Sequence, residues 1–74
     1  MHIDDYDKKV ETISRYRIAK DKKTEVLRRE NMLVQVKLCF DGEYYDFTLS
    51  GNEMAQLLSD FNDIDSIDDL FSTP

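Results

Sequence analysis

The sequence is poor in the residues that build disulfide staples, catalytic sites and phosphate loops. Its 74 residues include one cysteine, one histidine, one proline, two glycines and no tryptophan. Because Cys39 is alone, no disulfide can form within the chain, which excludes a disulfide-stapled extracellular scaffold. Zinc sites need clusters of cysteine and histidine, and a nucleophile needs a neighbouring base, which Cys39 and the near-terminal His2 do not provide. Gly42 and Gly51 are too few and too far apart for a glycine-rich phosphate loop. We therefore expect a protein that binds a partner, with no catalytic residue, metal or cofactor.

Long apolar runs are also missing. No stretch approaches the about 20 apolar residues that span a membrane. The first seven residues contain three aspartates and no apolar run, unlike a secretory signal. We expect a single domain, residues 1–74, of modest stability, in a bacterial or host cytosol.

Positive charge is absent from the second half of the sequence. Residues 38–74 hold nine acidic residues and no lysine or arginine, whereas residues 1–37 hold all ten basic residues and seven acidic ones. The net charge of −6 therefore combines a basic first half with a strongly acidic second half. Such asymmetry indicates either a charged partner or two solvated faces that keep a small protein soluble.

The clearest element is a β-hairpin over about residues 31–49. Apolar side chains alternate on both sides of Asp41-Gly42, a pair suited to the positive φ angles of a two-residue type I′ turn. That turn predicts a register in which every pair on one face is apolar, while Lys37 meets Asp46 on the other. The predicted apolar pairs are Leu38–Tyr45, Val36–Phe47 and Val34–Leu49.

Two helices are predicted after the hairpin. Ser50 and Glu53 have the spacing of a capping box, which starts a helix over about residues 51–61. Its apolar stripe has helical spacing and consists of Met54, Leu57, Leu58 and Phe61. A second, short helix is predicted over about residues 66–71. Both are expected to pack on the apolar face of the hairpin, giving an α+β fold.

The first thirty residues allow two interpretations. The spacing of Ile3, Tyr6, Val10 and Ile13 is typical of a helix. A competing alternation through residues 10–18 predicts an additional strand, in which residues 12–19 would pair with 25–31 about a turn at 21–24. No register of that second hairpin is as complementary as the first. The helix is therefore preferred, and the strand stays open.

The aspartate-rich run from Asp60 to Asp69 resembles a calcium-binding loop in composition only. Counted from Asp60, the sixth position, where such a loop needs glycine, is Asp65, and the twelfth, where it needs glutamate, is Phe71. We expect no metal site there.

Our leading hypothesis for function uses the acidic half. A dense row of carboxylates can occupy a groove that normally binds the closely spaced phosphates of DNA. Small acidic proteins of phages and mobile elements use such DNA mimicry against host nucleic-acid-processing proteins, and anti-CRISPR proteins are one example. The expected partner is a host protein with a basic nucleic-acid-binding groove. The expected partner-binding residues are Glu43, Asp46, Asp60, Asp63, Asp65, Asp68 and Asp69.

Two alternatives stay open. The basic segment 8–29 could follow a phosphate backbone, with a tyrosine stacked on a base, although the net charge of −6 opposes approach to nucleic acid. The residues of that nucleic-acid site would be Arg15, Tyr16, Arg17, Lys22, Lys23, Arg28 and Arg29. The third option is a protein–protein adaptor or homodimer, formed either by basic and acidic segments of two copies or through an uncovered second sheet face.

Overall fold

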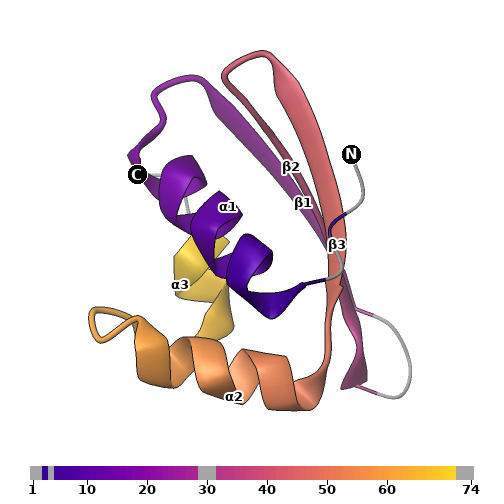
Figure 1. Cartoon of the computed structure of the whole chain (residues 1–74), viewed down its shortest axis with the longest axis vertical. Helices are drawn as coiled ribbons and strands as arrows, with labels where there is room; N and C mark the ends of the chain where they lie inside the picture. The colour runs from indigo at the N-terminus through magenta and orange to yellow at the C-terminus, as the bar shows by residue number, and fades with distance from the viewer. Residues whose placement is uncertain (1–2, 4, 29–31, 72–74) are drawn as a thin grey trace.

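The architecture is a three-stranded sheet with helices on one side. The computed structural model describes residue 3, residues 5–28 and residues 32–71. In chain order the elements are α1 (Tyr6–Ile18), β1 (Lys22–Arg28), β2 (Val34–Phe40), β3 (Glu43–Leu49), α2 (Gly51–Asp60) and α3 (Ile67–Phe71). The strands form one antiparallel sheet in the order β1-β2-β3, and the helices lie together on one side of it (Figure 1). This is the predicted small α+β domain.

The predicted hairpin is confirmed in turn and register. Asp41 and Gly42 have φ angles of 55° and 76°, as a type I′ turn requires. The pairs across β2 and β3 are the predicted ones, including Lys37 opposite Asp46. The start differs from the prediction, because β2 begins only at Val34. Met32 has a φ of 61°, a left-handed conformation that interrupts extended backbone, and Asn31 lies outside the described residues.

The preferred helix is confirmed, because α1 covers residues 6–18, where the competing strand was placed, and a strand, β1, follows it. Ile13 and Tyr16 are both fully buried, as helical spacing on one face of α1 requires. The alternative pairing of residues 12–19 with 25–31 is wrong, because residues 12–18 lie in α1 and β1 pairs with β2. Within β1, Thr24 and Val26 lie opposite Leu38 and Val36, which are buried neighbours on the covered face.

The first helix after the hairpin begins with the predicted capping box. The Ser50 hydroxyl accepts a hydrogen bond from the backbone N–H of Glu53 at 3.2 Å, and the Glu53 carboxylate accepts one from the backbone N–H of Ser50 at 3.0 Å. Helix α2 ends at Asp60 and Phe61 is its C-cap residue. Leu57 is fully buried, whereas Leu58 at the edge of the predicted stripe is half-exposed.

The core joins the helices to the covered face of the sheet. Tyr16 of α1 lies between Phe40 of β2 and Phe71 of α3, with ring centroids 5.9 Å and 6.4 Å away. Phe40 in turn stacks on Tyr45 at 5.0 Å. Edge and offset contacts of this kind add to the burial energy of the rings. They fix α1 and α3 relative to the hairpin end of the sheet.

A pair of isoleucines in α1 tests this packing. Ile13 is 0% exposed and Ile18 is 83% exposed, although both lie in the same helix. We expect Ile13→Ala to lower the free energy of unfolding by about 2–5 kcal/mol, because it removes buried methyl groups and leaves a cavity. Ile18→Ala should change it by less than about 0.5 kcal/mol. Urea denaturation followed by circular dichroism measures both, and equal effects would mean that α1 packs through another face.

Candidate functional site

The two oppositely charged halves of the chain are joined by ion pairs within the molecule. Lys9 pairs with Glu53, Arg17 with Asp63 and Arg28 with Asp68, at 2.7, 2.5 and 2.6 Å. In each pair the base comes from residues 9–28 and the acid from residues 53–68. Part of the charge asymmetry is therefore used for internal contacts, and the surface available to a partner is smaller than the sequence predicts.

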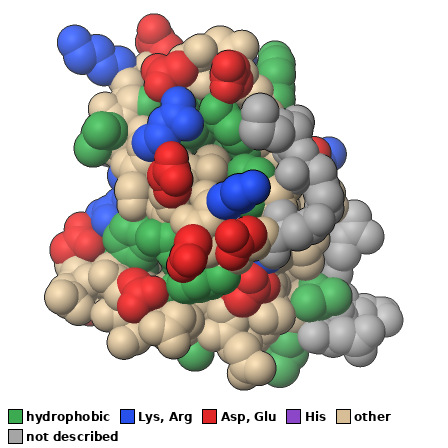
Figure 2. Space-filling view, viewed as in Figure 1, with side chains coloured by type: hydrophobic (Ala, Val, Ile, Leu, Met, Phe, Trp, Pro, Cys, Tyr) green, Lys and Arg blue, Asp and Glu red, His purple; other side chains and the backbone are tan. Residues whose placement is uncertain are grey.

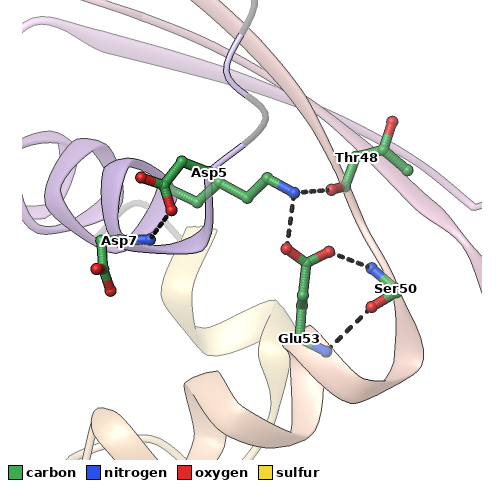
Figure 3. Close-up of polar contacts among 6 residues, drawn as sticks. Asp5, Asp7, Thr48, Ser50 and Glu53 are labelled. Atoms are coloured by element: carbon green, nitrogen blue, oxygen red, sulfur yellow. Dashed lines mark hydrogen bonds and ion pairs between the residues drawn. The ribbon is translucent and has the colours of Figure 1, made fainter.

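The Lys9–Glu53 pair is the most buried of these contacts. Lys9 is only 5% exposed, and its ammonium donates hydrogen bonds to the backbone oxygen of Thr48 and to Glu53 Oε2, both at 2.7 Å. The other carboxylate oxygen of Glu53 accepts the backbone N–H of Ser50 (Figure 3). We call Lys9, Thr48, Ser50 and Glu53 the Lys9 junction. It joins α1, the end of β3 and the start of α2 through partners that satisfy the buried charge.

The other two ion pairs lie at the surface. Arg17 donates to both carboxylate oxygens of Asp63, at 3.1 and 2.5 Å, and its guanidinium lies 5.4 Å from the ring centroid of Phe61. The hydrogen bonds from Arg17 lower the pKa of the Asp63 carboxyl. Arg28 and Asp68 are both more than half exposed, so we expect their contact to contribute about 0–1 kcal/mol. These pairs mainly neutralise charge at two positions of the acidic segment.

The seven predicted acidic residues do not form one surface. Asp60, Asp63, Asp65, Asp68 and Asp69 follow one another from the end of α2 into α3, in the helical layer, and all are exposed. Glu43 and Asp46 lie on β3, where Asp46 alternates with the buried residues and points to the uncovered sheet face. Glu43 accepts a hydrogen bond from the Tyr45 hydroxyl and so raises the pKa of that group. The sheet therefore separates Asp46 from the acidic residues of the helices.

A further group of carboxylates gathers around Tyr6 at the start of α1. The Tyr6 hydroxyl donates a 2.6 Å hydrogen bond to Asp60. Burial, this hydrogen bond and the negative charges of Asp60, Asp7 and Glu53 hold the pKa of Tyr6 well above its ordinary value. Figure 2 shows that acidic side chains outnumber Lys and Arg on this side of the molecule. The acidic surface thus extends from α2 onto α1, which the sequence prediction did not include.

The predicted basic site is divided even more strongly. Tyr16 is fully buried, and its hydroxyl accepts a hydrogen bond from Thr24, so the prediction that this ring stacks on a base is wrong. Arg17 and Arg28 are held by aspartates, as described above. The Lys22 ammonium binds the backbone oxygen of Arg17 at 3.0 Å and lies 4.9 Å from the Tyr16 ring centroid. These residues do not present a continuous row to a phosphate backbone.

The remaining basic residues point in different directions. The Arg15 guanidinium lies 5.5 Å from the ring centroid of Phe40 and 6.0 Å from that of Tyr45, on the helical side. Lys23 lies opposite Cys39 on the uncovered face of the sheet. Arg29 lies outside the described residues. The basic segment 8–29 is therefore contiguous in sequence and spread over both faces in space.

Among the described elements, no helix covers the second face of the sheet. The helices lie on the other face (Figure 1). On the second face, near the turn between β2 and β3, there is an open hollow of about 950 Å³. Tyr44, which is 74% exposed, and the half-buried Cys39 line this hollow beside Lys23 and Lys37. Cross-strand rows on this face mix both charges, as in the row Glu25–Lys37–Asp46. The face is moderately apolar and nearly balanced in charge.

The sequence analysis did not predict the contacts of Lys9 and Tyr6. Lys9 lies three residues after Tyr6 and four before Ile13, so helical spacing alone places it on the buried face of α1. A lysine on an apolar face needs an acidic partner, and that signal was present. The identity of the partner was not, because Glu53 is 44 residues away in the chain.

Other kinds of site find no support in the part of the chain described. No cluster of three or more His, Cys, Asp or Glu side chains in it is arranged to hold a metal ion. Of the helices described, none is both long and apolar enough to cross a membrane. No protein-family model, curated protein or solved structure matches the chain.

Two neighbouring lysines test the Lys9 junction. Lys9→Met keeps the length and apolar stem of the side chain but leaves Glu53 and the Thr48 oxygen without the ammonium. We expect it to lower the free energy of unfolding by about 1–3 kcal/mol. Lys8→Met should change it by less than about 0.5 kcal/mol, because Lys8 is exposed and has no partner among the described residues. Urea denaturation decides, and a neutral Lys9→Met would show that the junction does not stabilise the fold.

The pH dependence of stability gives a second test. Burial alone would raise the pKa of the Glu53 carboxyl above its ordinary value of 4.5, but hydrogen bonds from Lys9 and Ser50 outweigh it and lower the pKa. Such a group stabilises the fold above its unfolded-state pKa, and this contribution is lost as pH falls through the folded-state pKa. We therefore expect stability to decrease as pH is lowered below 4.5, with Asp63 contributing in the same direction.

Urea midpoints at a series of pH values between about pH 6 and pH 3 would measure this decrease. Glu53→Gln should be less stable at the upper end and should show a shallower decrease on acidification. Asp21→Asn is the matched control, because Asp21 is exposed and has no partner among the described residues. An unchanged slope in Glu53→Gln would mean that the Lys9 junction does not carry the acid sensitivity.

Proposed function

We propose that this protein is a small acidic inhibitor or modulator that binds a host nucleic-acid-processing protein through carboxylates of its helical layer. The partner would be a protein whose basic groove normally holds DNA or RNA, and the inhibitor would occupy that groove as a DNA mimic does. A phage- or mobile-element-encoded protein of the anti-CRISPR-like type is the class that this size and charge fit. Catalysis is not part of the proposal.

The observation that carries the proposal is the set of carboxylates left over once internal ion pairs are formed. Asp7 and Glu11 of α1, Asp60 of α2 and Asp65 beyond it are exposed, and none forms an ion pair with a described base. We call these four residues the acidic helical surface. Asp63 and Asp68 are neutralised by their arginines, so the proposed contact surface is centred nearer to α1 than the sequence suggested.

Mechanistically, such a surface works by attraction over distance and by contact. A net charge of −6 steers the protein towards a basic groove and speeds association. At contact, carboxylates form charge-assisted hydrogen bonds with the Arg and Lys side chains that would otherwise hold phosphates. The Lys9 junction and the aromatic core keep the helices fixed, so little conformational entropy is lost on binding.

A second candidate function is favoured by the uncovered sheet face. Because the helices cover only one face, the hollow beside Tyr44 and Cys39 remains accessible. Leu27 and Leu33 are also half-exposed, and mixed charges surround them. An adaptor that docks another protein on this face would use these features. Nucleic-acid binding through segment 8–29 has weaker support, since Tyr16 is buried and most of its arginines are engaged.

Affinity capture from bacterial lysate, with and without nuclease treatment, tests the leading proposal. The tagged protein should retain a nucleic-acid-processing protein after nuclease treatment and release it as salt is raised, because exposed charge pairs are screened. Retention of nucleic acid alone, or loss of the retained protein on nuclease treatment, would contradict it.

A matched pair of charge reversals locates the surface. Asp65→Lys alters the acidic helical surface, and Asp21→Lys makes the same change of charge at an exposed residue before β1. We expect Asp65→Lys to weaken binding of the captured protein about tenfold, and Asp21→Lys to leave it within about twofold. Binding assays with the purified target measure both. Equal losses would indicate only long-range charge, and loss on Tyr44→Ala alone would favour the sheet face.

A further inference from the structure

The outer edge of β1 is an uncovered strand edge. The sheet order places β1 and β3 at the two edges. The edge of β3 is partly occupied, because the backbone N–H of Ile3 donates to the backbone oxygen of Asp46 at 3.2 Å. In the part of the chain that the structure describes, no strand other than β2 pairs with β1. Such an edge presents unpaired backbone groups to another chain.

The two-residue turn determines which backbone groups of β1 point outwards. Phe40 and Glu43 flank the turn and form a hydrogen-bonded pair, so Cys39 directs its backbone groups towards β1. Along β1, the backbone N–H and C=O groups of successive residues then alternately bond to β2 and point away from it. The residues whose N–H and C=O groups point outwards are Lys22, Thr24, Val26 and Arg28.

We propose that two copies of this protein pair through their β1 strands, antiparallel, with Thr24 opposite Thr24 of the second copy. Outward-pointing residues then meet each other, with Lys22 opposite Val26 of the second copy, and exchange backbone hydrogen bonds. The two sheets join into one continuous sheet. A two-fold axis perpendicular to that sheet relates the copies, so both helical layers lie on the same side.

Charge selects this register. It places Lys23 opposite Glu25 of the second copy, twice by symmetry, in a non-hydrogen-bonded position where side chains are closest. Within the described chain, Lys23 and Glu25 have no ion pair of their own. A shift of the second copy by two residues would instead set Glu25 against Glu25 and Lys22 against Arg28, which is repulsive. Lysines on an edge strand usually oppose pairing with another strand, but in this register each Lys23 meets Glu25 of the second copy.

Two single charge reversals and their mixture test the proposal. Lys23→Glu places acidic residues opposite each other in a homodimer, and Glu25→Lys places lysines opposite each other. We expect each variant alone to dimerise about tenfold more weakly than the native protein. Mixed together, the two variants should form a heterodimer with native affinity, because every Lys again meets a Glu. Sedimentation velocity over a range of concentrations measures the dissociation constants.

The controls separate edge pairing from other effects. Lys8→Glu makes the same charge change on α1 and should leave dimerisation unchanged, and circular dichroism checks that each variant is folded. The native dimer should weaken with salt, because the two ion pairs are exposed. A native protein that stays monomeric at about millimolar concentration would overturn the proposal. So would a dimer insensitive to both reversals, or a mixture that fails to restore pairing.

Discussion

The buried ammonium of Lys9 is the interaction on which the arrangement of the helices depends. It lies where α1, the end of β3 and the start of α2 meet, and it bonds to one group from each of the other two elements. A buried charge is tolerated only when its partners are in place. The fold is therefore stable only when α1, the end of β3 and the start of α2 hold their native positions relative to one another. Glu53 takes part both in this contact and in the capping box, so the start of α2 and the position of α1 depend on the same side chain.

The same logic explains how the charge asymmetry is used. In the three ion pairs of the described residues, the acid lies 44, 46 or 40 residues after the base, so these contacts join α1 and β1 to the second half of the chain. These pairs do not change the net charge. They change where it is exposed, because Asp63 and Asp68 are neutralised while Asp7 and Asp65 are not. A charge profile read from the sequence therefore overstates the acidity of some positions and misses others.

The hairpin and the caps could be predicted because their signals are local. Asp41-Gly42 fixes the turn, the turn fixes the register, and the apolar pairs then agree with it. β1 was harder, because an edge strand has only one neighbour and its covered face holds Thr24 and Val26 among charged residues. Its partner is β2, the next strand in the chain, but the connecting residues 29–33 contain no pair like Asp41-Gly42 that would fix a register.

The candidate site was predicted less well for a physical reason. Whether a charged or aromatic side chain is exposed depends on which face of its element is covered. Tyr16 was predicted to stack on a base, but it lies three residues after Ile13 in α1 and is buried with it. The composition of segment 8–29 concealed this, since one buried tyrosine stands among many basic residues. Ion-pair partners are long-range and cannot be read from spacing at all. The acidic segment from Asp60 to Asp69 was found because its members are neighbours in sequence.

The two proposed surfaces are compatible in geometry. Pairing through β1 uses the edge of the sheet, whereas the acidic helical surface lies on the helical layer, away from the side chains of Lys23 and Glu25 on the open face. A two-fold axis perpendicular to the joined sheet keeps both helical layers on one side, so a dimer would direct two acidic surfaces the same way. Two such surfaces on one rigid sheet can engage a long basic groove, or two neighbouring grooves, with higher avidity than one. Self-association would in that way strengthen the proposed inhibition without adding any new contact to the target.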